Sequence, residues 1–262
     1  MQGSMIVIGA GRVGTALQAR STGIGVACSL VSRDAGWEAL ETPQGDPIIV
    51  AVRNDDLLDV VAKIPRNRRS DLVFIQNGAV REHLRDNALQ RSTRGLIYFA
   101  VSKRGDPISP GGTSWFSGTH GLAMARWFGA MGLAAESVDW GRFSFYELQK
   151  MCWIAAFGPL CDRHQIAVGA VVDDHRVELE ALVEEFAAIG RAALGVDVPL
   201  PYLVESLCAY SKTIPDYRAS TKEWRWRNGW FVDTAIRRGL PIPVQRELLA
   251  AIGRAHLIGE AP

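Results

Sequence analysis

The strongest fold signal in the sequence is the stretch Met5-Ile6-Val7-Ile8-Gly9-Ala10-Gly11-Arg12-Val13-Gly14. Its apolar first half predicts a buried strand, and residues 13–20 predict a helix directly after it. The turn between them has the pattern Gly-x-Gly-x-x-Gly, which allows a tight turn, close approach of a pyrophosphate and close packing of helix on strand. The stretch therefore predicts a βαβ unit that binds a dinucleotide, against the alternative of a glycine turn that binds nothing. The residues expected to hold the cofactor are Gly9, Ala10, Gly11, Arg12, Val13 and Gly14.

The end of the second predicted strand bears on which dinucleotide is bound. Residues 25–31 form that strand, and Ser32 and Arg33 follow it. A guanidinium can pair with a 2′-phosphate through two hydrogen bonds, and the serine hydroxyl can donate another, so the pair favours NADP. Asp34 leaves NAD open, because a shift of one or two positions would bring its carboxylate to the ribose hydroxyls.

The two halves of the chain differ in character. In the first half, further strands are predicted at residues 47–52, 72–75, 95–101 and 113–117, and a helix at 54–64. Short apolar strands between helices are typical of an α/β fold, here a Rossmann-type doubly wound parallel sheet. In the second half, helices are predicted at residues 142–164, 173–194, 202–213, 222–238 and 244–256. We expect an NADP-binding Rossmann domain over 1–140 and an all-helical substrate and catalytic domain over 141–262, with the substrate in the cleft between them.

Composition and charge narrow the class of protein. The 262 residues carry 29 Lys plus Arg against 28 Asp plus Glu, so no overall field attracts nucleic acid or a membrane surface. The four cysteines form no Cys-x-x-Cys pair and predict buried, reduced thiols and no metal site. The start of the chain lacks the pattern of a secretory signal, and no apolar run is long enough to span a bilayer. A cytoplasmic protein is expected.

Lys150 is the first candidate for chemistry. Reducing a carbonyl requires a hydride and a proton for the developing alkoxide, and Lys is one of the side chains that can supply the proton. The residues that follow Lys150 up to Leu160 are almost wholly apolar, so an ammonium there is desolvated and its pKa falls toward a useful range. The competing interpretation is a lysine whose ammonium reaches solvent along the helix surface.

A second group of candidates lies between Ser211 and Trp230. Glu223 is expected to begin a helix, where the helix dipole favours a carboxylate whether or not it takes part in catalysis. The alternating Trp and Arg residues after it could suggest a nucleic-acid surface, but a single such helix in a near-neutral protein favours amphipathic packing with an exposed Arg face. Trp224, Trp226 and Trp230 could equally line a pocket or a subunit interface of a homodimer.

Together these segments resemble ketopantoate reductases (2-dehydropantoate 2-reductases), NADPH-dependent enzymes that reduce a 2-oxo acid to a 2-hydroxy acid. The likeness runs over nearly the whole chain, although the chain is short for the family. The segments that carry it are Ile48-Ile49-Val50-Ala51-Val52-Arg53, Ile75-Gln76-Asn77-Gly78, Lys150 with Pro159-Leu160, Ser211, Glu223 with Asn228-Gly229, and Gly239-Leu240-Pro241-Ile242-Pro243.

The resemblance implies a role for each of these residues. Lys150 would donate the proton, Glu223 would orient Lys150 or hold a substrate hydroxyl, and Ser211 would contact the substrate carboxylate. Val52, Arg53 and Asn77 would help to hold the cofactor, with Asn77 near the nicotinamide.

The sequence departs from the family pattern at three substrate positions. Ile154, Gly158 and Cys208 stand where the family usually has asparagines that contact the substrate or support the lysine. A site built to hydrogen-bond a polar substrate loses discrimination without those amides. We therefore expect an NADPH-dependent reductase of a 2-oxo acid or a related carbonyl or imine, either ketopantoate itself or a less polar or larger compound.

Two other functions remain open at this point. The first is a non-catalytic NADP-binding sensor or assembly protein, which needs the glycine loop and Arg33 but not Lys150 with Glu223. The second is an opine-type or other dehydrogenase with the same two-domain plan, which would use a His–Asp relay. His164 and His175 lie in the helical half without a recognisable relay, so we expect them on helix surfaces or at helix ends.

Overall fold

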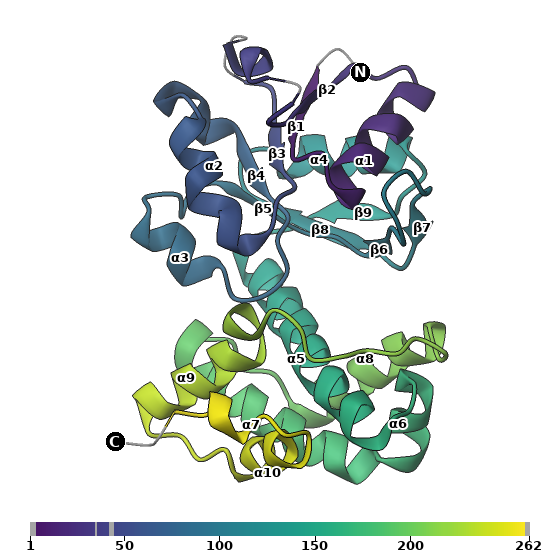
Figure 1. The fold of residues 1–262 in the computed structure, drawn as a ribbon, viewed down its shortest axis with the longest axis vertical. Coiled ribbons are helices and arrows are strands. Elements are labelled where there is room, and N and C mark those ends of the chain that lie inside the picture. The colour runs from purple at the N-terminus through teal and green to yellow at the C-terminus, as the bar shows by residue number, and fades with distance from the viewer. Residues whose placement is uncertain (1–3, 35, 42–44, 260–262) are drawn as a thin grey trace. The chain divides into compact units, whose positions relative to one another are not determined.

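The computed structural model describes residues 4–34, 36–41 and 45–259 of the chain. The chain divides into two compact units, Met1–Phe143 and Ser144–Pro262. The first unit holds all the strands in the described ranges, and the second is helical (Figure 1). No helix in the described ranges is long and apolar enough to cross a membrane, and all four cysteines are free.

A seven-stranded sheet in the order β2-β1-β3-β4-β5-β8-β9 forms the centre of the first unit. Its strands are β1 (Met5–Ile8), β2 (Cys28–Val31), β3 (Ile48–Val50), β4 (Leu72–Phe74), β5 (Thr93–Leu96), β8 (Ser114–Ser117) and β9 (Ala135–Ser137). A separate ribbon pairs β6 (Phe99–Ala100) with β7 (Ser109–Pro110). The helices of this unit are α1 (Arg12–Gly23), α2 (Leu57–Lys63), α3 (Arg81–Asp86) and α4 (Gly121–Ala130).

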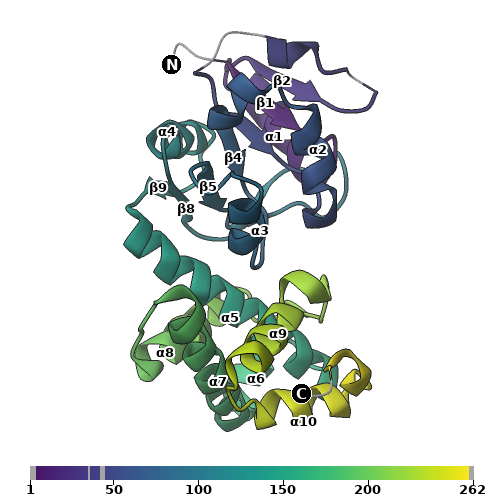
Figure 2. The ribbon, with the colours of Figure 1, turned by 90° about the vertical axis from the view of Figure 1, so that its left-hand side faces the viewer.

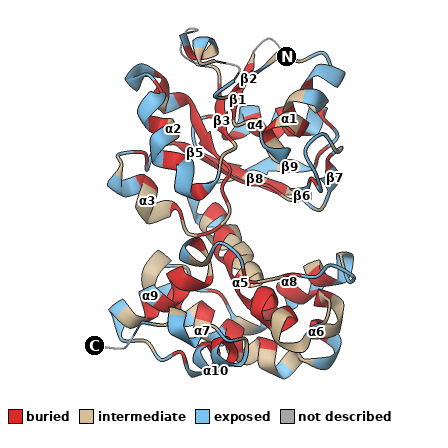
Figure 3. Ribbon diagram, in the orientation of Figure 1, coloured by how far each residue is buried: buried red, intermediate tan, exposed pale blue. Residues whose placement is uncertain are grey.

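The central strands are buried along their whole length, as expected for a parallel sheet covered on both faces. The side chains of β3 and β4 are shielded from solvent without alternation (Figure 3). One face packs Val7, Ile49 and Val73 into a core with Leu17 of α1 and Phe128 of α4. Helices α2 and α3 lie on the other face (Figures 1 and 2). The predicted α/β class is confirmed.

The sheet departs from a wholly parallel one at β8. Strands β2, β1, β3, β4 and β5 are parallel neighbours, but β8 pairs antiparallel with β5 and parallel with β9. A parallel pair needs a long crossover, usually a helix, and the segment between β5 and β8 contains only the β6–β7 ribbon. The single strand predicted over residues 95–101 is two strands in the structure: its first residues belong to β5 of the main sheet, and Phe99–Ala100 form β6 of the ribbon.

Six α-helices make up the second half of the described chain. They are α5 (Trp140–His164), α6 (Val168–Asp174), α7 (Arg176–Leu194), α8 (Leu200–Thr213), α9 (Asn228–Arg238) and α10 (Pro243–Ala251). Phe157, Phe186 and Phe231 are fully buried and form part of the core. The carboxylate of Glu185 on α7 accepts hydrogen bonds from the main-chain N–H groups of Val244 and Gln245 at 2.7 and 3.0 Å, so α7 caps the start of α10.

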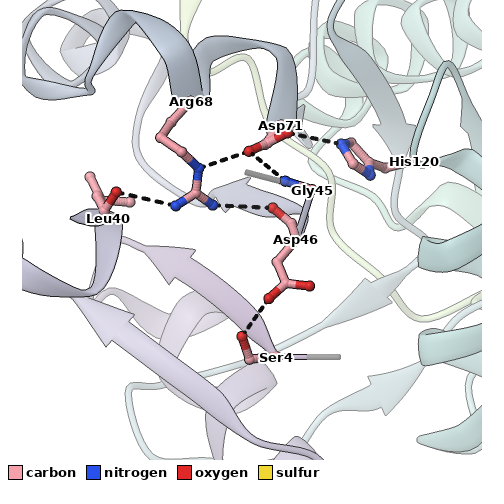
Figure 4. Close-up of polar contacts among 7 residues, drawn as sticks. All are labelled: Ser4, Leu40, Gly45, Asp46, Arg68, Asp71 and His120. Atoms are coloured by element: carbon pink, nitrogen blue, oxygen red, sulfur yellow. Dashed lines mark hydrogen bonds and ion pairs between the residues drawn. The ribbon is translucent and has the colours of Figure 1, made fainter. Parts of the chain in front are cut away.

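A buried charge network lies at the amino edge of the sheet, where β4 begins (Figure 4). The Arg68 side chain is only 1% exposed, and its Nε donates to Asp71 Oδ2 at 2.8 Å. The guanidinium also donates to the carbonyl oxygens of Leu40 at 3.1 Å and Asp46 at 3.4 Å. Asp71 lies 3.7 Å from His120 Nε2 through its other oxygen. One guanidinium therefore holds together loops that are far apart in the sequence.

Replacing Arg68 with methionine tests the network. Arg68→Met leaves the buried Asp71 carboxylate without its cation, which is expected to lower the free energy of unfolding by about 3–5 kcal/mol. Arg66→Met is the matched control, because Arg66 is exposed on the same 3-10 helix, Arg66–Asp71. Urea denaturation measures both variants, and equal losses would contradict a structural role for the buried guanidinium.

Candidate functional site

The carboxyl edge of the sheet collects the residues predicted to hold a cofactor. Ile8 is in register with both Val31 and Val50, and Val50 with Phe74, so β1, β2, β3 and β4 end at one edge. The segments that follow these strands contain all the predicted cofactor residues: Gly9 to Gly14, Ser32 and Arg33, Val52 and Arg53, and Asn77. The fold of the first unit therefore brings together residues up to about seventy positions apart.

Two glycines of the loop are required by close backbone contacts. Gly9 has φ +114°, and a Cβ there would lie 2.6 Å from the carbonyl oxygen of Ala51. A Cβ on Gly14 would lie 1.8 Å from the carbonyl oxygen of Gly9. No side chain fits at either position, so helix α1 approaches the end of β1 as closely as the backbone permits.

Gly11 differs, because no atom lies near the position of its missing Cβ. It is exposed and precedes α1 in an extended conformation, and no side chain caps this helix or places an acid in its first turn. The first N–H groups of α1 therefore face an open loop, which is the arrangement that binds phosphate at helix N-termini. The exposed Arg12 crosses to the carbonyl oxygen of Ser102 at 3.1 Å.

The side chains after β2 are accessible. Ser32 forms an isolated bridge with Gly36, and its hydroxyl accepts a hydrogen bond from the Asp34 main-chain N–H at 3.3 Å. Arg33 and Asp34 are both exposed, and so is Arg53 after β3. The turn after β2 thus exposes a guanidinium, of Arg33, and a carboxylate, of Asp34, at consecutive positions.

Two buried oxygen atoms after β4 have no hydrogen-bond partner among the residues that the structure describes. The amide nitrogen of Gln76 donates to the carbonyl oxygens of Val50 at 2.7 Å and Val52 at 3.2 Å, which fixes the orientation of the amide because its oxygen would be repelled there. Gln76 Oε1 and Asn77 Oδ1 are buried, and neither has a partner in the described part of the chain. Buried acceptors of this kind are costly unless a ligand or water donates to them. The sequence analysis gave a role to Asn77 but none to Gln76, although Gln76 belongs to the same motif and is a polar residue at the end of a buried strand.

Lys150 lies on α5 in the helical unit and is partly buried. Burial, and secondarily the positive charge of Arg227, lowers the pKa of its ammonium to about 7. The depressed pKa that sequence reasoning expected is thus present, and an amine with this pKa can give up a proton near neutral pH. Arg227 was not among the predicted site residues.

A proline inside α5 creates the attachment point for the segment before α9. Pro159 has no N–H, so the carbonyl oxygen of Ala155, four residues earlier, lacks its helical partner. The side-chain amide of Asn228 donates to this oxygen at 2.7 Å and is itself buried. Pro159 and Asn228, which both belong to segments that carry the family resemblance, therefore act on the same atom: Pro159 leaves the Ala155 carbonyl oxygen without a helical donor, and Asn228 supplies one.

Gly158 explains how close this segment comes to α5. A Cβ on Gly158 would lie 3.1 Å from the carbonyl carbon and oxygen of Ser220. The next N–H, of Thr221, donates to Asp162 Oδ2 at 2.8 Å. Main chain occupies the space beside Gly158, so a larger side chain there would require the segment at Ser220 and Thr221 to shift.

The hydroxyl of Ser211 is engaged on both sides. Ser211 is fully buried on α8, donates to the carbonyl oxygen of Leu207 at 2.9 Å, and accepts from the indole nitrogen of Trp153 at 2.9 Å. Trp153 also stacks on Phe157 with ring centroids 5.4 Å apart. This tryptophan, which sequence reasoning did not select, lies next to the partly buried Ile154 on α5.

Cys208 lies one turn before Ser211 on α8 and contacts a different group. Its thiol accepts a hydrogen bond from Arg176 Nη1 at 3.2 Å, and Arg176 also pairs with Glu180 and Glu205 at 2.6 Å each. Burial raises the pKa of the Cys208 thiol. The buried Cys208 thiol therefore contacts the ion pairs that Arg176 of α7 forms with Glu180 and with Glu205 of α8.

The expectation that Glu223 begins a helix is wrong. Glu223 has φ +49°, a short 3-10 turn follows, and α9 begins at Asn228. The break arises because Asn228 is anchored to α5 and because Gly229 packs against Trp224, whose carbonyl oxygen would lie 2.7 Å from a Cβ. Glu223 forms an ion pair with Arg227.

Two of the three histidines in the helical half, His164 and His175, lie at helix ends, as expected. His164 is the last residue of α5, and His175 precedes the first turn of α7. Their rings stack with centroids 3.6 Å apart, and Glu178 Oε2 lies 2.7 Å from His164 Nε2. Potential ligand atoms of His164, His175 and Glu178 lie within 4.8 Å of one another. Arg163 pairs with the other oxygen of Glu178 at 2.7 Å, and His175 Nδ1 lies 3.8 Å from Oε2, so Glu178 is the shared partner of Arg163 and the two histidines.

Comparison with known proteins gives a result for structure only. No family model matches the sequence, and no curated protein matches it. A PanE/ApbA family ketopantoate reductase from Ralstonia eutropha is 21% identical over 95% of this chain and 97% of its own, with a TM-score of 0.73. A 2-dehydropantoate 2-reductase from Methylococcus capsulatus is 19% identical over 97% of each chain, with a TM-score of 0.75. D-Mandelate dehydrogenase in complex with NADH is 13% identical over 98% of this chain and 100% of its own, with a TM-score of 0.72. The fold that the resemblance implied is confirmed.

A double-mutant cycle tests the contact between Asn228 and α5. Asn228→Ala leaves the Ala155 carbonyl buried without a donor, which is expected to lower the free energy of unfolding by about 1–3 kcal/mol. Pro159→Ala restores a helical N–H for that oxygen, so the double variant should lose less than the sum of the single changes. Denaturation of all four proteins gives the coupling energy, and additive losses would contradict the proposed partnership.

Proposed function

We propose that the protein is an NADPH-dependent reductase of a 2-oxo acid or a closely related carbonyl compound. The observation that carries the proposal is Lys150, an amine with a pKa of about 7 on the helical unit of a fold shared with ketopantoate reductases and D-mandelate dehydrogenase. A sensor that only binds the dinucleotide has no use for an amine in this state. A His–Asp relay is not supported, because the acid that contacts His164 is Glu178, which also pairs with Arg163.

The first unit fits a dinucleotide on its own geometry. The loop at Gly11 offers unpaired N–H groups for the pyrophosphate, and the close contacts at Gly9 and Gly14 hold that loop in place. Gln76 Oε1 and Asn77 Oδ1 are acceptors that the carboxamide of a nicotinamide would complete. When bound, the nicotinamide supplies the hydride.

The choice of NADP is proposed from the residues after β2. Arg33 is exposed directly beyond the strand end, and a guanidinium gives a 2′-phosphate a paired, charge-assisted contact. The mandelate dehydrogenase neighbours were solved with NADH, and Asp34 offers a carboxylate beside Arg33, so NAD is the alternative for this chain.

Lys150 would act at the carbonyl oxygen of the substrate. Its ammonium stabilises negative charge as that charge develops on the oxygen and then transfers a proton to it. The pKa of about 7 keeps a large share of the amine protonated at neutral pH and makes the transfer easy. Glu223 would act on Lys150 through Arg227, with which it is paired.

The substrate is proposed to be less polar than ketopantoate, or to be bound through contacts other than side-chain amides. Ile154 presents an alkyl group, main chain fills the space beside Gly158, and Cys208 contacts Arg176, so none of the three offers an amide to a substrate hydroxyl. A homodimer is a further proposal, supported by a dimeric ketopantoate reductase of this fold from Staphylococcus aureus.

Loss of the amine tests the proton-transfer role. Lys150→Ala is expected to abolish NADPH oxidation with 2-oxo acids while NADPH binding is unchanged, because the first unit is not altered. In the wild type, the protonated amine is the active form in reduction, so the rate should fall roughly tenfold per pH unit above a pKa of about 7. Lys212→Ala, an exposed lysine of the same unit, is the control. Retained turnover in Lys150→Ala would overturn the role.

Cofactor selectivity tests the contribution of Arg33. Arg33→Ala should raise the KM for NADPH by about 10- to 100-fold and change the KM for NADH little, because only NADPH carries the 2′-phosphate. Arg91→Ala serves as the matched control, since Arg91 is exposed just before β5, at the opposite edge of the sheet. Equal effects of Arg33→Ala on both cofactors would favour a site for NAD.

A further inference from the structure

The chain needs a residue that binds the carboxylate of a 2-oxo acid, and the residue that the resemblance implies for this role is engaged elsewhere. The Ser211 hydroxyl donates to Leu207 and accepts from the Trp153 indole, and the side chain is 0% exposed. Its single donor hydrogen is therefore used inside the helix. An anion would have to displace these contacts to be bound there.

Arg227 has the properties that Ser211 lacks. Its Nη2 pairs with Glu223, its side chain is 17% exposed, and its Nε is buried without a partner in the described part of the chain. A buried N–H with no acceptor is costly, and a carboxylate is the acceptor that a guanidinium binds best. Glu223, at 43% exposed, does not bury the pair.

The anchoring of the segment to α5 brings the charge of Arg227 within electrostatic reach of Lys150. Asn228, the next residue, is held at Ala155 of α5 by its 2.7 Å hydrogen bond. Ala155 is five residues from Lys150, a rise of about 7.5 Å along the helix. The positive charge of Arg227 acts on Lys150 and contributes to its lowered pKa. The hydrogen bond between Asn228 and Ala155 thus keeps Arg227 and Lys150 near each other without involving either of their side chains.

We propose that Arg227 binds the substrate carboxylate and that, together with Lys150, it forms the recognition site for a 2-oxo acid anion; this inference rests on the proposed function. A 2-oxo acid has a carboxylate on the carbon next to its carbonyl. A guanidinium on the carboxylate and an ammonium on the carbonyl oxygen hold it at two points and fix which face of the carbonyl is presented.

The site also links substrate binding to the proton of Lys150. Arg227 is the charged group that acts on Lys150, Glu223 is paired with Arg227, and Glu147 is buried three residues before Lys150 on α5. A bound carboxylate offsets the charge of Arg227 and adds a negative charge near the amine. The ammonium form of Lys150 is therefore favoured in the complex, when its proton is needed.

Substitution of Arg227 separates this proposal from the proposed function. Arg227→Met should raise the KM for a 2-oxo acid by about 10- to 100-fold and leave the KM for the corresponding uncharged 2-oxo amide nearly unchanged. Arg227→Lys should recover part of the loss. Arg225→Met is the matched control, because Arg225 is exposed on the same segment and lies over the Trp226 ring at 5.0 Å. An unchanged ratio of the two KM values in Arg227→Met would overturn the role of Arg227 while leaving the reductase in place.

The pH profiles of the unaltered protein test the proposal even if Arg227→Met fails to fold. The limb of the kcat profile should lie at higher pH than the limb of kcat/KM, because the first reports the complex and the second the free enzyme. Coincident limbs would contradict the coupling. Oxamate, a non-reducible analogue of a 2-oxo acid, should quench tryptophan fluorescence of the wild type and not of Arg227→Met. If the wild type reduces no 2-oxo acid, the proposed function fails, and oxamate binding that depends on Arg227 would still support the anion site.

Discussion

The carbonyl oxygen of Ala155 is the constraint on which the candidate site of the helical unit depends. Pro159 removes its helical partner, and a buried acceptor must find a donor elsewhere. Asn228 supplies that donor, and in doing so it fixes the start of α9 and the position of the residue before it, Arg227. Gly158 and Asp162 hold the earlier part of the same segment on α5. The helical hydrogen bond that Pro159 removes from α5 thus determines the position of the charged segment that acts on Lys150.

The glycine loop of the first unit is likewise fixed by close contacts between main-chain atoms. Gly14 meets the carbonyl of Gly9, and Gly9 meets that of Ala51, so the loop is fixed by contacts that exclude any side chain. Gly11 is left open to solvent between them. The combination of a rigid loop and uncapped helix N–H groups explains why this edge of the sheet suits a phosphate, whatever is bound further along.

The sequence was most informative where local pattern and structure have the same cause. The strands at Ile8, Val50 and Phe74 were predictable because fully buried parallel strands are continuous apolar runs. The glycine loop was predictable because steric exclusion leaves a spaced pattern of glycines. The direction of β8 was not, since it depends on the absence of a crossover helix and not on the residues of the strand.

Contacts between distant segments were the part that sequence could not supply. The partners of Ser211 and Cys208 come from α5 and α7, and no local pattern indicates either. Arg227 could not be distinguished from Arg225 by composition, because they differ in exposure: Arg227 is partly buried and Arg225 is exposed. The Arg68 network joins segments around Leu40, Asp71 and His120, and it was likewise invisible in the sequence.

Hydride transfer is the most direct test of the central claim, that this chain is an NADPH-dependent reductase of 2-oxo acids. The purified protein would be incubated with a panel of 2-oxo acids and NADPH deuterated at the transferred position of the nicotinamide. The account predicts one deuterium at C2 of the 2-hydroxy acid product for each NADPH oxidised. Tight NADPH binding with no deuterium transferred to any member of the panel would contradict it and leave a dinucleotide-binding protein without this activity.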